Sequence, residues 1–302
     1  MDIKSKIILI SGPTASGKSN FAIKIAKKIN GEIVNADSMQ VYKELRILTA
    51  RPKKTEYQNI KHHLYGFQSV KKSFSTGDWL KLVTKKIIAI KKRKKIPVIV
   101  GGTGLYFKAL TNGLVKIPSI PIKFRNKIRS LQKKLGQKKF YKKLIKLDSL
   151  VEKKIKSTDV QRSIRAYEVK DYTKKSLVDW YVNTKSNFSD NDFIKIYIDF
   201  PRTILLDNIL IRTEKMIKSG AISEVKKFLN LKIKKDKTPN KVIGIAEIRD
   251  FIRKKTTLNE VKEKITIKTR QYAKRQSTWA RGQMMNWQKI DPKDINKFLK
   301  KI

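Results

Sequence analysis

The 302-residue sequence contains no cysteine and only two histidines. The lack of cysteine excludes a disulfide framework and any thiolate metal site, and it agrees with a reducing compartment. The adjacent pair His62 and His63 is too small for a metal site without further ligands, so we expect both to be structural. No apolar run approaches the ~20 residues that a membrane-spanning helix needs, and the opening apolar stretch is too short for a signal peptide. We therefore expect a soluble, cytoplasmic protein without a membrane partner.

Acidic side chains are scarce compared with basic ones. The sequence holds 25 Asp and Glu residues against 72 Lys and Arg residues, which gives a formal net charge of +47. Clustered cations gain affinity for nucleic acid because they displace counterions from its phosphates. Much of the excess is lysine, in runs such as residues 91–95 that are typical of solvated helix faces, and a genome rich in lysine codons would explain it equally well. The charge permits an RNA partner and does not establish one.

Short apolar segments alternate with amphipathic ones in the first third of the chain. Apolar runs predict strands at 6–10, 32–38 and 96–104, whereas apolar residues at helical spacing predict helices at 19–29 and 78–95. This alternation indicates an α/β fold with a parallel sheet whose ligands bind at the carboxyl ends of the strands. Segment 193–201 alternates like a further strand and is expected to return to the sheet.

A second domain is expected to interrupt this core. Pro118 and Pro121 break the pattern, and the very basic segment 122–147 has a helical character. The expected division is 1–115 for the first part of the core, 116–192 for a helical inserted domain, and 193–302 for core completion and C-terminal helices.

Residues 12–19 satisfy the pattern G-x-x-x-x-G-K-[ST] between a predicted strand and a predicted helix. In such a loop the backbone N–H groups and the helix N-terminus face an anion, Lys18 adds a mobile cation, and the Ser19 hydroxyl can ligate Mg²⁺. The expected diphosphate-binding or nucleotide-binding residues are Gly12, Pro13, Thr14, Ala15, Ser16, Gly17, Lys18 and Ser19. The loop recognises a diphosphate unit and does not say whether that unit belongs to ATP.

Two further polar residues lie at the carboxyl ends of predicted strands beside this loop. Asp37 has three roles open to it: a magnesium ligand, a base that accepts a proton, or a buried structural carboxylate. Thr103, within the GGTG segment, is placed either to donate its hydroxyl to phosphate or to cap a turn. No apolar strand ends in the magnesium-binding Asp of a Walker B run, and no arginine-rich lid is evident. These absences weaken a reading based on ATP hydrolysis.

Two segments are more distinctive than the phosphate loop: DSMQVY at 37–42 and GGTGLYFKAL at 101–110. Together with seven other segments in the same order, they make nearly the whole chain resemble the tRNA dimethylallyltransferases, also called tRNA isopentenyltransferases. The nine matching segments are 12–19, 35–52, 62–64, 74–79, 97–110, 159–169, 216–225, 242–248 and 269–279.

The resemblance implies a P-loop NTPase-like core with a basic inserted domain that binds tRNA. It implies transfer of a dimethylallyl group from dimethylallyl diphosphate to N6 of the adenosine at position 37 of tRNA, in the anticodon loop, with Mg²⁺ as cofactor and diphosphate as the second product. The phosphate loop would then hold the diphosphate of the prenyl donor, Thr103 would help it leave, and Asp37 would accept the N6 proton. The implied tRNA contacts are Asp37, Ser38, Met39, Gln40, Thr103, Arg125, Gln161, Arg162, Ser163, Ile164 and Arg165.

The sequence departs from the family pattern at two positions. The family usually shows two arginines four residues apart, but here Asn208 takes the first position and Arg212, the expected diphosphate ligand, takes the second. Ile245 replaces an aromatic residue of the family's GYKE segment. Tyr272 and Gln276 share one helical face with Trp279 and are expected to pack in the core.

Three other functions remain open from the residues. A P-loop small-molecule or nucleoside kinase would transfer phosphate without tRNA, and a basic RNA-dependent ATPase would hydrolyse ATP. An adenylate isopentenyltransferase would use a free nucleotide as acceptor. The basic inserted segment favours a macromolecular acceptor, and we expect a monomer.

Overall fold

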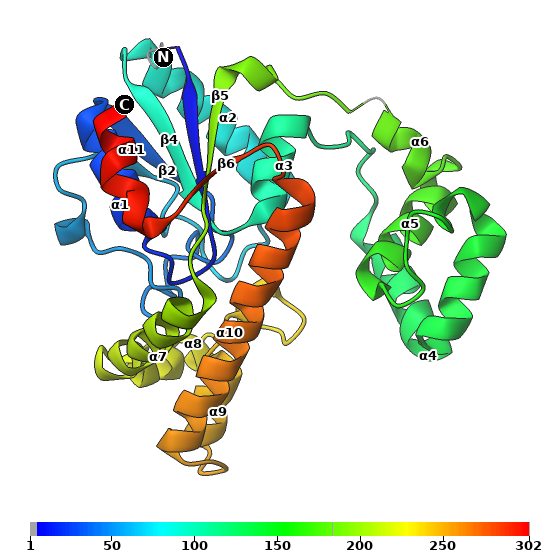
Figure 1. Ribbon diagram of the computed structural model, residues 1–302. Coiled ribbons are helices and arrows are strands. Elements are labelled where there is room, and N and C mark those ends of the chain that lie inside the picture. Colours follow the sequence, from blue (N-terminus) through cyan, green and yellow to red (C-terminus); the bar gives the residue numbers. More distant parts are fainter. Residues whose placement is uncertain (1–4, 183, 302) are drawn as a thin grey trace. The chain divides into compact units, whose positions relative to one another are not determined.

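The computed structural model describes residues 5–182 and 184–301, the last of these without its side chain (Figure 1). The chain divides into two compact units: Met1–Thr111 with Phe188–Ile302, and Asn112–Asn187. The second unit begins and ends a few residues before the expected inserted domain, 116–192. Because the first unit is made of two chain segments, the second is an insertion within it.

A six-stranded parallel sheet forms the centre of the first unit, with the strand order β3-β2-β4-β1-β5-β6. The strands are β1 (Ile7–Ser11), β2 (Gly31–Asn35), β3 (His62–His63), β4 (Ile96–Gly101), β5 (Phe193–Ile198) and β6 (Gln288–Ile290). The predicted return of the chain to the sheet is confirmed, because β5 pairs with β1 from Ile7↔Phe193 to Ser11↔Tyr197. This arrangement confirms the α/β fold class.

Helices cover both faces of the sheet (Figure 1). Successive side chains of a strand point to opposite faces, so Ile7 and Leu9 of β1 pack beneath α2 and α3, whereas Ile8 and Ile10 pack against α1. The helices of the first unit are α1 (Lys18–Lys28), α2 (Thr76–Lys92), α3 (Gly104–Asn112), α7 (Arg202–Lys218), α8 (Ala221–Asn230), α9 (Ile245–Ile252), α10 (Leu258–Gln283) and α11 (Ile295–Lys301). Burial of both faces explains why the central strands are continuous apolar runs.

A third apolar cluster joins the loop after β2 to the C-terminal helices. Tyr42, Leu45 and Leu48 of this loop are buried against Phe228 of α8 and Ile265 of α10. The loop is therefore fixed by helices that come almost two hundred residues later in the chain, and it forms one wall of the site described below.

The second unit contains α4 (Ile122–Leu147), α5 (Val160–Thr173) and α6 (Leu177–Val182). Phe140 and Leu144 of α4 pack against Tyr167 of α5 in its apolar core. Gly136 has φ 69° and interrupts the helical geometry of α4, so α4 is two helical segments joined at a bend. In the parts of the chain described here, no helix is both long and apolar enough to span a membrane.

Candidate active site

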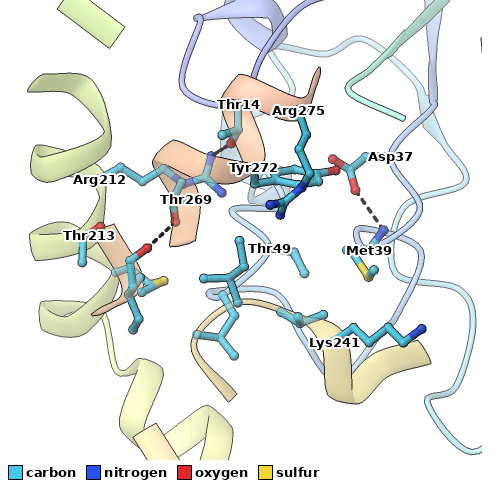
Figure 2. Close-up of a pocket in the computed structure, with 15 residues that line it drawn as sticks. Thr14, Asp37, Met39, Thr49, Arg212, Thr213, Lys241, Thr269, Tyr272 and Arg275 are labelled. Atoms are coloured by element: carbon cyan, nitrogen blue, oxygen red, sulfur yellow. Dashed lines mark hydrogen bonds between the residues drawn. The ribbon is translucent and has the colours of Figure 1, made fainter. Parts of the chain in front are cut away.

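The candidate site lies at the carboxyl ends of the neighbouring strands β1, β4 and β2. Two cavities meet there, and Thr14, Asp37, Thr49 and Arg212 contribute to the walls of both. The smaller, of about 160 Å³, is lined by the phosphate loop with Tyr65, Val100 and Gly101, and we call it the phosphate cavity. The larger, of about 260 Å³, is shown in Figure 2, and we call it the apolar cavity.

Two cations, Lys18 and Arg212, give the phosphate cavity its character. Lys18 Nζ donates a hydrogen bond to Pro13 O (3.0 Å), and Arg212 Nη1 donates one to Thr14 Oγ1 (2.9 Å). Ser16 Oγ is buried and has no hydrogen-bond partner among the described residues. Ser16 is not among the residues that line the cavity, whereas Lys18 and Arg212 are, and two cations in one cavity are suited to bind an anion. The structure therefore brings Lys18 of the predicted phosphate loop into the cavity wall, and the ligand of the loop stays a prediction.

Burial lowers the pKa of Lys18 to about 8, because the charged ammonium loses solvation; Asp37 opposes this shift and Arg212 adds to it. Burial also lowers the pKa of Arg212. A bound diphosphate would supply negative charge that balances the buried positive charges of Lys18 and Arg212. Anion binding is therefore the function that these charges support.

This pKa gives a pH dependence with a definite sign. Because Lys18 is charged below about pH 8 and neutral above it, we expect kcat/KM for a diphosphate substrate to fall as the pH rises through 8. The measurement is a pH profile from 6.5 to 10 at low substrate concentration. In Lys18→Arg the alkaline decline should vanish even if the overall rate is lower; a decline that persists in this variant would contradict the assignment.

The carboxylate of Asp37 is held in a tight turn that faces both cavities. Asp37 Oδ1 accepts hydrogen bonds from Met39 N (2.8 Å) and Gln40 N (3.4 Å). The Asn35 side chain donates to Asp37 O (3.0 Å) and accepts from Asp37 N (2.9 Å). The expected strand 32–38 ends at Asn35, because these side-chain hydrogen bonds turn the chain away from the sheet. The turn orients Asp37 Oδ1 and leaves Oδ2 without a hydrogen bond within the described chain.

Thr103 supports this turn from the neighbouring strand end. Its Oγ1 accepts a hydrogen bond from Ser38 N (2.9 Å), and its N–H donates to Ala36 O (3.2 Å). Thr103 is not among the residues that line either cavity. The structure thus places it behind Asp37 and Ser38, and its predicted contact with a departing diphosphate stays a prediction.

The two outer glycines of the GGTG segment allow close contacts that a side chain would block. A Cβ on Gly101 would lie 2.1 Å from Ala36 O, and one on Gly104 would lie 2.3 Å from the Trp279 ring. Glycine at these positions lets the end of β4 approach the Asp37 turn and lets the start of α3 approach α10.

Gln276 of α10 does more than the packing that its position predicted. Its Oε1 accepts a hydrogen bond from Thr14 N (2.9 Å), and its Nε2 donates to Gly102 O (2.8 Å). One side chain therefore joins the phosphate loop to the loop after β4. From the sequence, Gln276 could be placed only on one helical face with Tyr272 and Trp279. That position does not show whether its side chain packs in the core or hydrogen-bonds to two loops.

We expect Gln276→Met to lower kcat/KM for the diphosphate substrate about tenfold, because the Thr14 N–H loses its buried acceptor. Steady-state kinetics at several substrate concentrations would measure the effect. Gln271→Met, an exposed change on the same helix, serves as the matched control. Equal rates for the two variants would refute a role for the bridge.

Glu224 of α8 is a second residue that sequence reasoning missed. Its carboxylate accepts hydrogen bonds from Arg46 N (2.8 Å), Ile47 N (2.8 and 3.0 Å) and Leu48 N (3.0 Å). This contact fixes the loop that carries Leu48 and Thr49 into the cavity walls. Its only sequence signal was membership of the matching segment 216–225.

The apolar cavity has a mixed lining, in which hydrophobic side chains lie among polar and charged ones (Figure 2). Thr14 and Asp37 lie at one side of it, and Lys241 and Arg275 add cations to the wall (Figure 2). Burial raises the pKa of Tyr272, with a further contribution from Asp37, so its phenol stays protonated. The hydrophobic wall residues are Met39, Leu48, Met216, Val242, Ile243 and Ile265. Such a cavity suits a small hydrocarbon group attached to an anion.

The two departures from the family pattern have local explanations. Asn208 Nδ2 donates to Ala15 O (3.3 Å), so it binds the backbone of the phosphate loop without adding charge. Ile245 is 1% exposed and packs in the third apolar cluster. In this chain, therefore, position 245 belongs to the core.

The predicted tRNA contacts fall in both units. Residues 37–40 and Thr103 belong to the first unit, whereas Arg125 and residues 161–165 belong to the second. Ser163 is fully buried and donates to Asp159 O (2.6 Å), so its side chain supports α5 and does not face a partner. The other predicted contacts in the second unit stay predictions.

The histidines have structural partners, as expected. His62 Nδ1 lies 2.9 Å from Ile60 O, and His63 Nε2 lies 2.6 Å from the buried Glu32, which also pairs with Arg93. Burial lowers the pKa of both histidines. In the described residues, no cluster of three or more potential His, Asp or Glu metal ligands occurs.

Comparison with known proteins gives concordant matches. Residues 40–283 match the family model described as IPP transferase. The chain is 64% identical to the tRNA dimethylallyltransferase of Pelagibacter ubique over all of this chain and 96% of that protein. It is 42% identical to that of Agrobacterium fabrum over 97% of this chain and 99% of that protein.

Solved structures give the same result. A tRNA isopentenylpyrophosphate transferase from Bacillus halodurans aligns with a TM-score of 0.70 at 30% identity, over 98% of this chain and 95% of that one. A eukaryotic dimethylallyltransferase acting on tRNA aligns with a TM-score of 0.80 at 28% identity, over 95% and 73% of the two chains.

Proposed function

Because the chain belongs to the IPP transferase family, we propose that it transfers a dimethylallyl group from dimethylallyl diphosphate to N6 of the adenosine at position 37 of tRNA, next to the anticodon. The observation that carries this proposal is the wall that the two cavities share, formed by Thr14, Asp37, Thr49 and Arg212. A diphosphate in one cavity would have its alkyl group in the other. The same relatives argue against the kinase alternative.

The residues suit departure of an allylic diphosphate. As the C–O bond breaks, negative charge grows on the leaving group, and Lys18, Arg212 and the loop N–H groups lie where they can stabilise it. The hydrophobic side chains in the wall of the apolar cavity, such as Leu48 and Ile265, would contact the allylic group. The adenine amine then forms the new C–N bond and loses a proton, and we propose that Asp37 accepts it, because its Oδ1 is held by Met39 N while Oδ2 has no hydrogen bond within the described chain.

The same site has donors that fit Mg²⁺. The Ser19 hydroxyl and the Asp37 carboxylate both line the phosphate cavity, and Mg²⁺ commonly takes one or two protein oxygens together with phosphate oxygens. When bound there, Mg²⁺ would neutralise part of the charge on the departing diphosphate. Ser19 is the residue that we propose as its ligand.

The proposal includes a monomeric enzyme that acts in the cytoplasm on the anticodon loop. The residues that the two cavities share, Thr14, Asp37, Thr49 and Arg212, all come from one chain, and this supports a monomer. An adenine must leave its stack to enter an enclosed site, and anticodon loops offer such unpaired bases.

A transfer assay tests the activity. Purified protein is incubated with Mg²⁺, labelled dimethylallyl diphosphate and unmodified tRNA, beside tubes that contain AMP as acceptor or labelled ATP as donor. We expect label in tRNA only, located at adenosine 37 by nuclease mapping. Phosphoryl transfer from ATP without transfer to tRNA would overturn the proposal and restore the kinase alternative.

A further inference from the structure

Three arginines of the second unit converge on one buried carboxylate. Glu168 of α5 has a side chain that is only 2% exposed. Its Oε2 lies 3.3 Å from Arg125 Nε and 3.4 Å from Arg165 Nη1, and its Oε1 lies 3.7 Å from Arg129 Nε. Arg125 and Arg129 are one turn apart on α4, and Arg165 is one turn before Glu168 on α5. We call these three residues the arginine cluster.

Most of the positive charge and most of the N–H donors of the arginine cluster are not used by Glu168. Three guanidinium groups face one carboxylate, so two positive charges are not compensated within the cluster. Each of these contacts engages a single guanidinium nitrogen, although every arginine carries five N–H donors. The side chains of Arg125, Arg129 and Arg165 are 36%, 42% and 39% exposed. Partly exposed guanidinium groups with spare donors are the usual ligands of phosphate.

Neutralisation of Glu168 does not explain why three arginines are present. A buried carboxylate needs a compensating partner, and one well-placed arginine can supply it. Here none of the contacts is as short as a strong charge-assisted hydrogen bond, and Glu168 Oε1 lacks a hydrogen bond among the described residues. The carboxylate is therefore shared among several side chains, and its effect is to hold all of them over one small area.

We propose that Glu168 is a positioning residue that presets the arginine cluster as a binding site for the phosphate backbone of RNA. Long side chains lose conformational entropy when they bind a ligand. Side chains that Glu168 already holds in place lose less on binding, so the affinity for the ligand is higher. Arg125 and Arg165 were expected to contact tRNA from the sequence; Glu168 and Arg129 were not. The identification of the RNA as tRNA rests on the proposed function.

Substitution of Glu168 separates positioning from simple electrostatics. Glu168→Gln makes the protein more positive by one charge, so charge alone predicts tighter RNA binding. Loss of positioning predicts the opposite, and we expect about tenfold weaker binding of unmodified tRNA. Glu152→Gln is the matched control, because Glu152 is exposed in the same unit and the change in charge is the same. Fluorescence titration with labelled tRNA measures both.

Substitution of Arg129 provides the second test. Without the Arg129 side chain, Glu168 keeps Arg125 and Arg165 as partners. We expect Arg129→Ala to weaken binding and to reduce the slope of log affinity against log salt by about one, as loss of a phosphate contact does. Lys127→Ala removes the same charge from an exposed position of α4 and serves as its control. In transfer assays, Glu168→Gln and Arg129→Ala should raise the KM for tRNA and leave the KM for dimethylallyl diphosphate unchanged.

The outcomes distinguish this proposal from the proposed function. Binding by Glu168→Gln that is as tight as that of Glu152→Gln, or tighter, would overturn it. If thermal unfolding shows that Glu168→Gln is not folded, the comparison of Arg129→Ala with Lys127→Ala decides, and equal salt slopes overturn the proposal. These titrations need no turnover, whereas failure of the proposed function would appear as a wild-type protein that binds tRNA and yields no product.

Discussion

Asp37→Asn is expected to lower kcat about 10²–10⁴-fold, the usual contribution of a positioned general base. The asparagine can keep its side-chain oxygen on Met39 N, so the turn should persist and the affinities for tRNA and dimethylallyl diphosphate should stay near their wild-type values. Single-turnover kinetics with saturating substrates would isolate the chemical step from binding.

The matched control for this variant is Asp199→Asn. Asp199 is exposed and directly follows β5, so it also lies at the carboxyl edge of the sheet but outside both cavities. We expect its rate to stay close to that of the wild type. Near-normal turnover in Asp37→Asn would remove Asp37 from the mechanism, and it would leave the structural role of its turn as the explanation for its position.

Arg212→Ala is expected to lower kcat/KM for dimethylallyl diphosphate about 10²–10³-fold, as loss of a preorganised donor to a developing anion does. Arg212 lies in the walls of both cavities and contacts Thr14 Oγ1, so its loss removes a charge from their shared wall and a support of the loop. Lys218→Ala, an exposed change near the end of the same helix, is the control.

A second readout of Arg212→Ala is independent of its rate. The charge of Arg212 helps to lower the pKa of Lys18, so its removal should move the alkaline decline of kcat/KM from about pH 8 to higher pH. A slow variant with an unshifted pH profile would show that the two cations do not act in one electrostatic site.

Much of the site could be predicted because its parts are local in the sequence. The phosphate loop needs only the short stretch from β1 to α1, and the strand ends near Asp37 and Thr103 follow from apolar runs that stop. The residues that hold these parts together were not predictable in the same way. Gln276 meets Thr14 across 262 positions, and Glu224 meets Arg46 across 178. No local pattern encodes such a contact, since a glutamine or a glutamate on an amphipathic helix has many possible partners.

The two edge strands were missed for a different reason. β3 consists of His62 and His63 alone, and β6 is the three-residue segment Gln288–Ile290. Neither is long enough to show alternation, and neither is rich in apolar residues. They become strands because their backbones pair with the edge of an existing sheet. This pairing depends on the fold and not on the propensity of these residues.

The pairing of β5 with β1 has a consequence for biosynthesis. While the ribosome is producing residues 112–187, β1 can pair with β4 on one side, but its other edge has no partner until residues 193–198 have emerged. An apolar strand with an open edge is a template for pairing with other chains. At ordinary elongation rates of about 5–20 residues per second, this exposure lasts several seconds. The length of the insertion between the two halves of the core thus sets how long this edge of β1 stays open in the nascent chain.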